Sequence, residues 1–576
     1  MGTNISKQKR DDLIAKVKDI RTFIAAAPQD ENTGALLTYL GELEKEVKSK
    51  KYGLVFEEHH EGIDEVLATH VPVLTEEKDL FIDNNGQLHF LIEGDNLTAL
   101  QLLLKTHKGM IDLIYIDPPY NTEEKDFIYD DDFVDKNDSF RHSKWLSFMQ
   151  KRLHLCKSLL SKNGFIFISI DDNEASQLKI LCDSIFGEEN YEKTDYIQVR
   201  YPEKTLKSDM KYHKEIEQVL LYKRSPSAKP YIKPEAYDYG KFVFQFEELA
   251  SGKTIELGNK QVIVFEPGDY RIIQHKEGFK EGLKEVWATG TILNGNSSGR
   301  FFRDYLSDRK DIDGLGALYK VFGIGDDQYD YRYFTGPKQA KATKGKYYQG
   351  VPIEKLEDGA EKIAPIPNFY DMAADFGNIR HEGKMSFNGG KKPVKLIKRY
   401  IDYFEREDIT VLDFFAGSGS TGHAVLASNN EGGNRRFILV TNNQNNICRD
   451  ITYPRLKNVL EEFGDQDSLK YYRMDFVPVG EKVYYEYADE LLIHIRELVE
   501  LENGINFTGN AEIAIVLNDD ELEAFISNIG QYEMCQRLYR GHDILLSAEQ
   551  EAKLQERNII VCVIPDYYYR ELEGGK

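Results

Sequence analysis

Short, continuously apolar runs alternate with longer amphipathic segments in two stretches of this chain, residues 88–186 and 393–440. The apolar runs predict strands that are buried on both faces of a sheet, at 88–92, 111–116, 165–170, 410–414 and 436–440. The intervening segments have helical spacing, at 97–105, 145–160, 173–186, 393–404 and 421–427. Buried strands that alternate with helices predict the α/β class, a doubly wound, largely parallel sheet covered on both faces.

Three stretches flank or interrupt this pattern, so the 576 residues divide into five parts. Residues 1–55 contain two predicted helices and form an extension. Residues 56–190 and 371–478 are the two halves of the α/β core. Residues 191–370, with short aromatic-rich strands, glycine turns and basic patches, form an inserted domain. Residues 479–576 form an acidic C-terminal domain, expected to be of the α+β type.

The net charge of −23 argues at first against a nucleic-acid partner, because phosphate attraction needs Lys and Arg. The acidity is concentrated in residues 461–576, which hold 10 Lys and Arg against 25 Asp and Glu. Residues 191–350 hold 27 basic against 23 acidic residues. A local basic surface is therefore possible in the insertion, and it makes this domain the candidate for target recognition. Its candidate basic residues are Arg300, Arg303, Arg332, Lys338, Lys341, Lys344 and Lys346.

The chain shows no sign of a membrane or secretory protein. No run approaches the roughly 18 apolar residues of a membrane span, and the N-terminus is polar. The five cysteines show no C-x-x-C spacing, so we expect reduced thiols rather than disulfides or a zinc site. These features predict a cytoplasmic protein.

The tetrapeptide Asp117-Pro118-Pro119-Tyr120 follows the predicted strand 111–116 directly. Ligands of open α/β sheets bind at the carboxyl ends of strands. The prolines stiffen the turn and remove backbone donors, which leaves the Pro118 carbonyl free beside the Asp117 carboxylate. Two acceptors and the aromatic face of Tyr120 would then suit an exocyclic amino group on a nucleobase, whose lone pair is delocalised into its ring. The alternative is an ordinary proline-rich turn.

A second motif, Asp413 to Gly422, closes one predicted strand and opens a helix. Its glycines let the backbone approach a bound nucleotide closely, which implies a nucleoside cofactor. Gly417, Gly419 and Gly422 also match the G-x-G-x-x-G fingerprint of nicotinamide enzymes. That fingerprint needs an acidic residue after the next strand, where this chain has Asn442 and Asn443. No lysine follows the glycines either, which disfavours a phosphate-binding loop.

Together the two motifs resemble those of S-adenosylmethionine-dependent amino methyltransferases of DNA, in the permuted beta order with the catalytic motif first. The resemblance covers roughly residues 50–460. Over this range the chain is similar to the modification subunits of type III restriction systems. The further segments that carry it are Gly94 to Leu97, Trp145 to Met149, Ser169 to Glu174, Lys392 to Val394 and Arg435 to Val440. In the strand order 3-2-1-4-5 of such a sheet, the catalytic and cofactor strands are neighbours although far apart in sequence.

The resemblance implies roles for individual residues. Asp117, Pro118, Pro119 and Tyr120 would be catalytic, acting without a metal on an adenine flipped out of the duplex. Asp95 would meet the adenine amino group of the cofactor, with Lys392 and Pro393 in a segment packed over it. The remaining cofactor-binding residues would be Asn96, Asp413, Phe415, Ala416, Gly417, Ser418, Gly419, Thr421 and Asn443. The family usually has an acidic residue near Asn443 for the ribose, so ribose binding is open.

The resemblance also implies partners and leaves alternatives. Double-stranded DNA, a second copy of the chain and a helicase or nuclease restriction subunit are the expected partners. The leading function is adenine-N6 methylation. Cytosine-N4 methylation obeys the same two-acceptor logic, although an aspartate at the start of the tetrapeptide favours adenine. The further alternatives are a DNA-recognition subunit that acts mainly through a partner, and a nicotinamide oxidoreductase.

Overall fold

The protein divides into two compact units in a computed structural model. The described residues are 5–26, 33–48, 56–122, 128–129, 132–133, 140–203, 212–288, 297–357, 359–385, 391–464, 467–478, 491, 494–506, 512–541 and 544–564. One unit comprises Met1–Tyr231 with Pro367–Lys576, and the other comprises Ile232–Ile366. No helix within the described ranges combines the length and the hydropathy that a membrane crossing requires.

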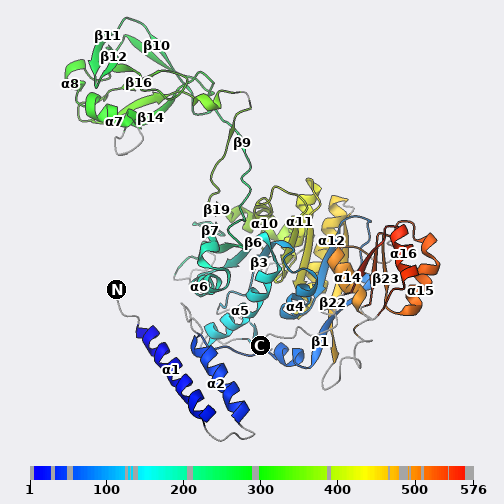
Figure 1. The fold of residues 1–576 in the computed structure, drawn as a ribbon. Coiled ribbons are helices and arrows are strands. Elements are labelled where there is room, and N and C mark those ends of the chain that lie inside the picture. Colours follow the sequence, from blue (N-terminus) through cyan, green and yellow to red (C-terminus); the bar gives the residue numbers. More distant parts are fainter. Residues whose placement is uncertain are drawn as a thin grey trace. The chain divides into compact units, whose positions relative to one another are not determined.

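The first unit is built on a ten-stranded sheet in the order β1-β22-β2-β21-β20-β3-β6-β8-β7-β19 (Figure 1). Its five central strands are parallel: β2 (Leu88–Glu93), β21 (Arg436–Thr441), β20 (Thr410–Asp413), β3 (Ile111–Ile116) and β6 (Leu160–Ile170). This is the doubly wound order 3-2-1-4-5 that the sequence predicts. Two strands from the second half of the core therefore lie between two strands from the first half.

The outer strands extend the sheet on both sides. On one side, β22 (Ser468–Pro478) runs parallel to β2 and pairs with β1 (His70–Glu76) antiparallel. On the other side, β8 (Ile216–Lys223) lies antiparallel to β6, followed by β7 (Tyr191–Gln198) and β19 (Phe369–Asp371).

The insertion is therefore shorter than the predicted 191–370, because its first residues belong to the core sheet. Val219, Leu220 and Leu221 of β8 are buried, so this strand completes the hydrophobic core instead of starting a new domain. The inserted unit runs from Ile232 to Ile366.

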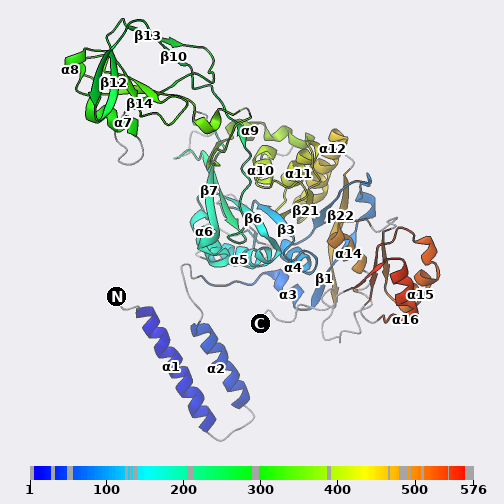
Figure 2. The ribbon, with the colours of Figure 1, turned by 45° about the horizontal axis from the view of Figure 1, so that its top comes forward.

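Helices cover both faces of the sheet, as expected for strands with continuous apolar sequence. One face carries α4 (Asn96–Thr106), α5 (Arg141–Leu159) and α6 (Ala175–Phe186), and the other carries α10 (Val394–Ile401), α11 (Ser420–Asn430) and α12 (Tyr453–Phe463) (Figure 2). Helix α14 (Ile495–Asn503) packs beside α4 and β1.

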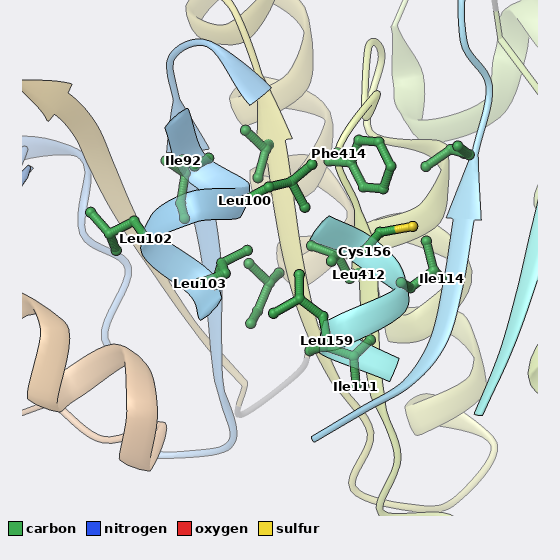
Figure 3. Packing of buried hydrophobic residues seen from close by; sticks show 14 of the residues in the cluster. Ile92, Leu100, Leu102, Leu103, Ile111, Ile114, Cys156, Leu159, Leu412 and Phe414 are labelled. Carbon is green, nitrogen blue, oxygen red and sulfur yellow. The ribbon is translucent and has the colours of Figure 1, made fainter. Parts of the chain in front are cut away.

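One continuous core lies under α4 and α5 (Figure 3). Ile114 of β3 and Leu412 of β20 are fully buried there, together with Leu100 and Leu103 of α4 and Leu159 of α5. Burying each such side chain contributes about 1.5–3 kcal/mol. The strands whose ends carry the two sequence motifs thus share one tightly packed core, which holds the motifs in a fixed relation.

The second unit is an antiparallel sheet with a core on each face. Its six strands have the order β11 (Lys253–Leu257), β12 (Lys260–Phe265), β15 (Leu318–Phe322), β16 (Tyr331–Thr335), β17 (Gly345–Gln349) and β14 (Lys284–Ala288). One core contains Phe302 and Phe334, near α7 (Ser297–Phe301). On the other face, β10 (Phe244–Glu248) and β13 (Tyr270–Gln274) pair as a two-stranded antiparallel sheet, and Phe246 of β10 stacks on Tyr333.

The two ends of the chain form separate elements. Helices α1 (Ile5–Ala26) and α2 (Thr33–Lys48) form a hairpin linked by Arg21 and Glu44, close to the helices that the sequence predicts. Near the C-terminus, β23 (Ile513–Val516), β24 (Arg537–Arg540) and β25 (Ile560–Val563) form a parallel sheet with α15 (Asp519–Ser527) and α16 (Ala548–Glu556) as crossovers. This region is α/β and differs from the α+β arrangement expected, because each strand reaches the next through a helix.

Candidate active site

Both sequence motifs lie at the same edge of the sheet. β3 and β20 are neighbouring parallel strands, with Leu113 opposite Val411 and Ile114 opposite Leu412. Both strands therefore end on the same side, one in Asp413 and the other immediately before Asp117. The predicted catalytic and cofactor motifs are thus brought together by strand pairing.

The tetrapeptide is held from outside by a buried tryptophan. Nε1 of Trp145, in α5, donates a 2.7 Å hydrogen bond to the carbonyl oxygen of Pro119. Within the described ranges, no group donates to the carbonyl of Pro118. Among the described residues, the Pro118 carbonyl is therefore an open acceptor.

The residue after the tetrapeptide is locked by a buried carboxylate. Asn121 adopts a left-handed backbone with φ of 55°. Its side-chain nitrogen donates to Glu174 Oε1 at 2.5 Å and to the carbonyl of Arg141 at 3.4 Å. His142 Nδ1 lies 2.6 Å from the same Glu174 oxygen, and the side chain of Glu174 is fully buried. Asn121 and Glu174 therefore fix the exit of the turn.

Asp117 and three other polar side chains form one network. The hydroxyl of Tyr120 lies 2.8 Å from Asp117 Oδ1 and 3.1 Å from Glu217 Oε2. Lys392 Nζ lies 2.6 Å from both Glu217 Oε2 and the Tyr120 hydroxyl, and 3.3 Å from Asp117 Oδ1. In the part of the chain that the structure describes, no group donates to Asp117 Oδ2. With respect to the described residues, the carboxylate thus has one engaged and one open oxygen.

The charges in this network oppose and balance one another. Burial raises the pKa of Asp117, and the negative charge of Glu217 adds to the rise, whereas the ammonium of Lys392 counteracts it. Burial alone would lower the pKa of Lys392, but Asp117 and Glu217 together raise it. Burial and the two carboxylates also raise the pKa of Tyr120, so its hydroxyl stays protonated. Lys392 is therefore the cation that offsets part of the effect of burial on the pKa of Asp117.

Lys392 occupies a different place from the one expected. The resemblance assigned it, with Pro393, to the segment over the cofactor. Its ammonium instead faces the tetrapeptide and lies 4.9 Å from the centre of the Tyr120 ring. Pro393 directly precedes α10, where its fixed backbone starts the helix.

The glycine loop is anchored by its own aspartate. Asp413 accepts hydrogen bonds from Thr421 Oγ1 at 2.5 Å and from the backbone nitrogen of Phe415 at 2.9 Å. Burial raises the pKa of Asp413 to about 7, partly offset by these two hydrogen bonds and reinforced by Asp117. The nitrogen of Ala416 donates to Val440 in β21. These contacts fix the loop shape from both ends.

Two residues beyond the motif support the loop from behind. Arg455, fully buried in α12, donates through Nη1 to Ser418 and to Ser420 Oγ. The hydroxyl of Thr452 donates to the carbonyl of Gly417 at 2.5 Å. Among the described atoms within 4 Å, a Cβ at Gly417 would meet only the carbonyl oxygen of Phe415, at 3.8 Å. With φ of 47° at Gly417, the loop presents its backbone to space that a ligand can fill.

Asp95 and Asn96 join the loop through an arginine. Asp95 Oδ1 caps α4 by accepting from the nitrogens of Leu97 and Thr98. The side chain of Asn96 donates to the carbonyl of Phe414 and accepts from Arg152 Nε. Both residues therefore lie beside the glycine loop, and the second Asp95 oxygen, 3.5 Å from Arg152, is the part oriented away from the helix cap.

Arg152 itself is held in place by two further groups. It forms a bidentate ion pair with Glu61, at 3.0 and 2.9 Å, and stacks 3.6 Å above the ring of Phe148. Phe148 in turn contacts Phe415, with ring centres 5.8 Å apart. An arginine-centred bridge thus connects the segment before α4 with the glycine loop.

Asn443 serves a local structural purpose. Its Oδ1 accepts from the nitrogens of Cys448 at 3.1 Å and Arg449 at 3.3 Å, at the start of a π-helical turn. It follows β21 at the same edge of the sheet as the two motifs. The amide that stands in place of the family's acid is therefore used to cap the next turn.

In the inserted unit, the candidate basic residues separate into two groups. Arg332 is buried and pairs with Asp326 and Asp327, Arg303 pairs with Asp304, and Lys346 pairs with Glu285. Arg303 is exposed despite this pairing, and Arg300, Lys338, Lys341 and Lys344 are exposed as well. Phe334 and Tyr348, two aromatic residues of β16 and β17, are buried in the cores of the sheet.

Five charged residues of the site were not anticipated from the sequence: Glu217, Glu174, Arg152, Glu61 and Arg455. Each lies within an otherwise regular strand, helix or turn. In such a segment a single charged residue normally indicates a solvent-exposed position. A signal was present only for Glu174, which belongs to a segment that resembles the family. The others become visible only when strands and helices distant in sequence are packed together.

The comparison with protein-family models decides the family. A model described as "DNA methylase", for N6 and N4 enzymes, matches residues 111–453, which include both motifs and the inserted unit. The chain belongs to this DNA methylase family.

Among similar proteins of this kind are modification subunits of type III systems. The Mod subunit of the StyLTI enzyme from Salmonella typhimurium is 28% identical over 424 residues, covering 67% of this chain and 58% of the relative. The Mod subunit of EcoP15I from Escherichia coli is 28% identical over 405 residues, covering 61% of this chain and 57% of the relative. The matched region is thus little more than half the length of these relatives.

A type II enzyme and several solved structures are also similar. M.KpnI from Klebsiella pneumoniae is 28% identical over 407 residues, covering 67% of this chain and 90% of the relative. A putative DNA modification methylase from Thermus thermophilus, solved with S-adenosyl-L-methionine, is 12% identical with a TM-score of 0.31, covering 66% of this chain and 97% of that one.

Asn121 offers a test of the turn that follows the tetrapeptide. Asn121→Ala and Asn121→Gly both remove the hydrogen bonds to Glu174 and Arg141. Only Ala pays the left-handed backbone penalty of about 1–2 kcal/mol, while Gly loses some chain entropy. We expect both variants to be less stable than the native protein, and Asn121→Ala to be the less stable by about 1 kcal/mol. Urea unfolding measures this difference, and equal stabilities would contradict the left-handed geometry.

Proposed function

We propose that this chain transfers a methyl group from S-adenosylmethionine to N6 of adenine in double-stranded DNA, as the modification and recognition subunit of a type III-like restriction-modification system. One observation carries the proposal: at the end of β3, beside the glycine loop of β20, Asp117 Oδ2 and the Pro118 carbonyl are two acceptors to which no described residue donates. The family match and the type III relatives support it.

The residues around Asp117 would act on a base that has left the stack. A target adenine must be flipped out, since its amino group cannot be reached within the duplex. Asp117 Oδ2 and the Pro118 carbonyl would accept hydrogen bonds from the two amino hydrogens and favour the pyramidal nitrogen. Lys392 lies against the Tyr120 ring, so the base would stack on the remaining face of that ring. Positioning and fixed dipoles would then supply most of the acceleration.

The residues of the second motif fit the proposed cofactor. When bound, S-adenosylmethionine supplies an electrophilic methyl group on a positively charged sulfur. Gly417 leaves room over the loop, and Asp413 is a carboxylate whose charge suits a cationic ligand. Phe415, Ala416, Ser418, Gly419 and Thr421 would shape the pocket. Asp95 would meet the adenine of the cofactor with its second oxygen, Asn96 would hold the pocket wall, and the amides near Asn443 would serve the ribose.

The proposal includes partners and location. The inserted unit Ile232–Ile366 would contact DNA and read the target sequence. A second copy of this chain and a restriction subunit would complete the assembly, and action on cellular DNA would place it in the cytoplasm.

Methyl transfer with defined products is the decisive experiment. Purified protein is incubated with unmethylated plasmid DNA and tritiated S-adenosylmethionine, and the DNA is digested to nucleosides. We expect N6-methyl-2′-deoxyadenosine from the native chain and a loss of about 10²-fold or more in Asp117→Ala, which loses its acceptor. Label in N4-methyl-2′-deoxycytidine would establish the cytosine alternative. DNA binding without incorporation would favour a recognition subunit.

The raised pKa of Asp413 predicts how cofactor affinity depends on pH. A carboxylate with a pKa of about 7 is mostly protonated at pH 6 and mostly ionised at pH 8. If only the ionised form binds the cation, affinity should rise up to about tenfold between these values. Calorimetric titration with S-adenosylmethionine measures it. Asp413→Asn is the control, because the ligand's own amino group titrates equally in both proteins. Identical pH dependence in the two would place the cation away from Asp413.

The exposed lysines between β16 and β17 test the role of the inserted unit. Lys341→Ala/Lys344→Ala should weaken binding to every DNA sequence about equally and reduce the salt slope by about one for each phosphate that is no longer neutralised. The matched control is Lys108→Ala/Lys162→Ala. It removes two exposed lysines from the edge of the core sheet opposite to the one that carries the two motifs. Fluorescence anisotropy at several salt concentrations gives both slopes. Equal effects of the two pairs would show a general charge effect.

A further inference from the structure

Glu217 reaches the candidate active site through the reversed direction of β8. Because β8 is antiparallel to β6, with Gln218 opposite Ile170, the first residues of β8 lie where β6 ends. That is the edge at which β3 and β20 also end. A glutamate near the start of an edge-side strand is thereby placed among the residues of the tetrapeptide.

Glu217 and Asp117 share the same two donors. Glu217 Oε2 lies 3.1 Å from the Tyr120 hydroxyl and 2.6 Å from Lys392 Nζ. Asp117 Oδ1 lies 2.8 Å and 3.3 Å from the same two atoms. The hydroxyl has a single hydrogen, so it can donate to one carboxylate at a time. The ammonium is closer to Glu217, and only one oxygen of Asp117 takes part.

Building on the function proposed above, we propose that Glu217 is a positioning residue for methyl transfer, which holds Lys392 and the Tyr120 hydroxyl so that Asp117 keeps one oxygen for the target amino group. Glu217 does not touch the base. It acts through Lys392 and Tyr120, and its side chain is one-quarter exposed while that of Lys392 is 8% exposed. The buried ammonium is thus shared and does not collapse onto the catalytic carboxylate.

The charge balance gives opposite consequences for the two partners. The ionisable groups that act on Asp117 are Lys392, Glu217 and Tyr120, with Tyr115 and Asp413 close by. Without the charge of Glu217, Lys392 would act on Asp117 alone and lower its pKa. Without Lys392, two carboxylates would face each other and the pKa of Asp117 would rise. If Glu217 only supported the fold, its removal would not change the pKa of Asp117.

The test compares the pH dependence of kcat in matched variants. The rate of tritium incorporation into unmethylated plasmid DNA is followed from pH 5 to 9. Glu217→Gln keeps the shape but removes the charge, and we expect kcat to fall about tenfold or more with little change in KM for DNA or cofactor. The acidic limb of its pH–kcat profile should move to lower pH. In Lys392→Met the acidic limb should move to higher pH. Glu217→Asp, which restores the charge, should return the limb toward its native position.

A control variant and two contrary results complete the test of Glu217. Glu188→Gln neutralises an exposed glutamate of the same unit and should leave kcat and the pH profile unchanged. Native kcat and profile in Glu217→Gln would overturn the inference, and so would a loss of rate that follows lost thermal stability with an unmoved acidic limb. In both cases the native chain still methylates, so the proposed function survives. A native chain that transfers no methyl group would overturn both.

Discussion

The parallel pairing of β20 with β3 is the constraint on which the rest of the site depends. It sets two strands from distant parts of the chain side by side, with Leu412 opposite Ile114 in the same core. Because parallel neighbours end on one side, a turn with two acceptors and a glycine loop come to the same edge. Without this pairing, the tetrapeptide would be a stiff turn and the glycine loop a helix start, each with no partner.

Three buried cations, Lys392, Arg152 and Arg455, determine the electrostatics of the sheet edge that carries the candidate active site. Lys392 contacts two carboxylates and a tyrosine hydroxyl. Arg152 pairs with Glu61 and Arg455 pairs with Glu382. Both arginines also donate hydrogen bonds to residues of the glycine loop or next to it. Burying a charge is costly unless it is paired. Each of these three buried cations has a carboxylate partner. The site is arranged to accept hydrogen bonds and positive charge.

The sequence predicts the parts of this protein that depend on local pattern. Continuous apolar runs gave the positions of β2, β3 and β21, and the strand order in the sheet is confirmed. The inserted unit was placed too early because β8 has the same short, aromatic-containing texture as the strands that follow it. Lys392 was expected over the cofactor, since motif resemblance locates a segment but does not give the direction of a side chain. Glu217 had no signal, because its neighbours come from β3 and from the segment before α10.

The position of β20 and β21 between β2 and β3 has a consequence for biosynthesis. On the ribosome, β2 and β3 emerge about 300 residues before the strands that separate them, which at ~5–20 residues per second is roughly 15–60 seconds. During that interval β2 lacks both of its neighbours, β21 and β22, and β3 lacks β20. The contacts that these apolar strands finally make with them are among the most non-local a chain can make. Nascent molecules interrupted before β20 would therefore be exposed to aggregation, and protection by chaperones would matter most for the first half of the chain.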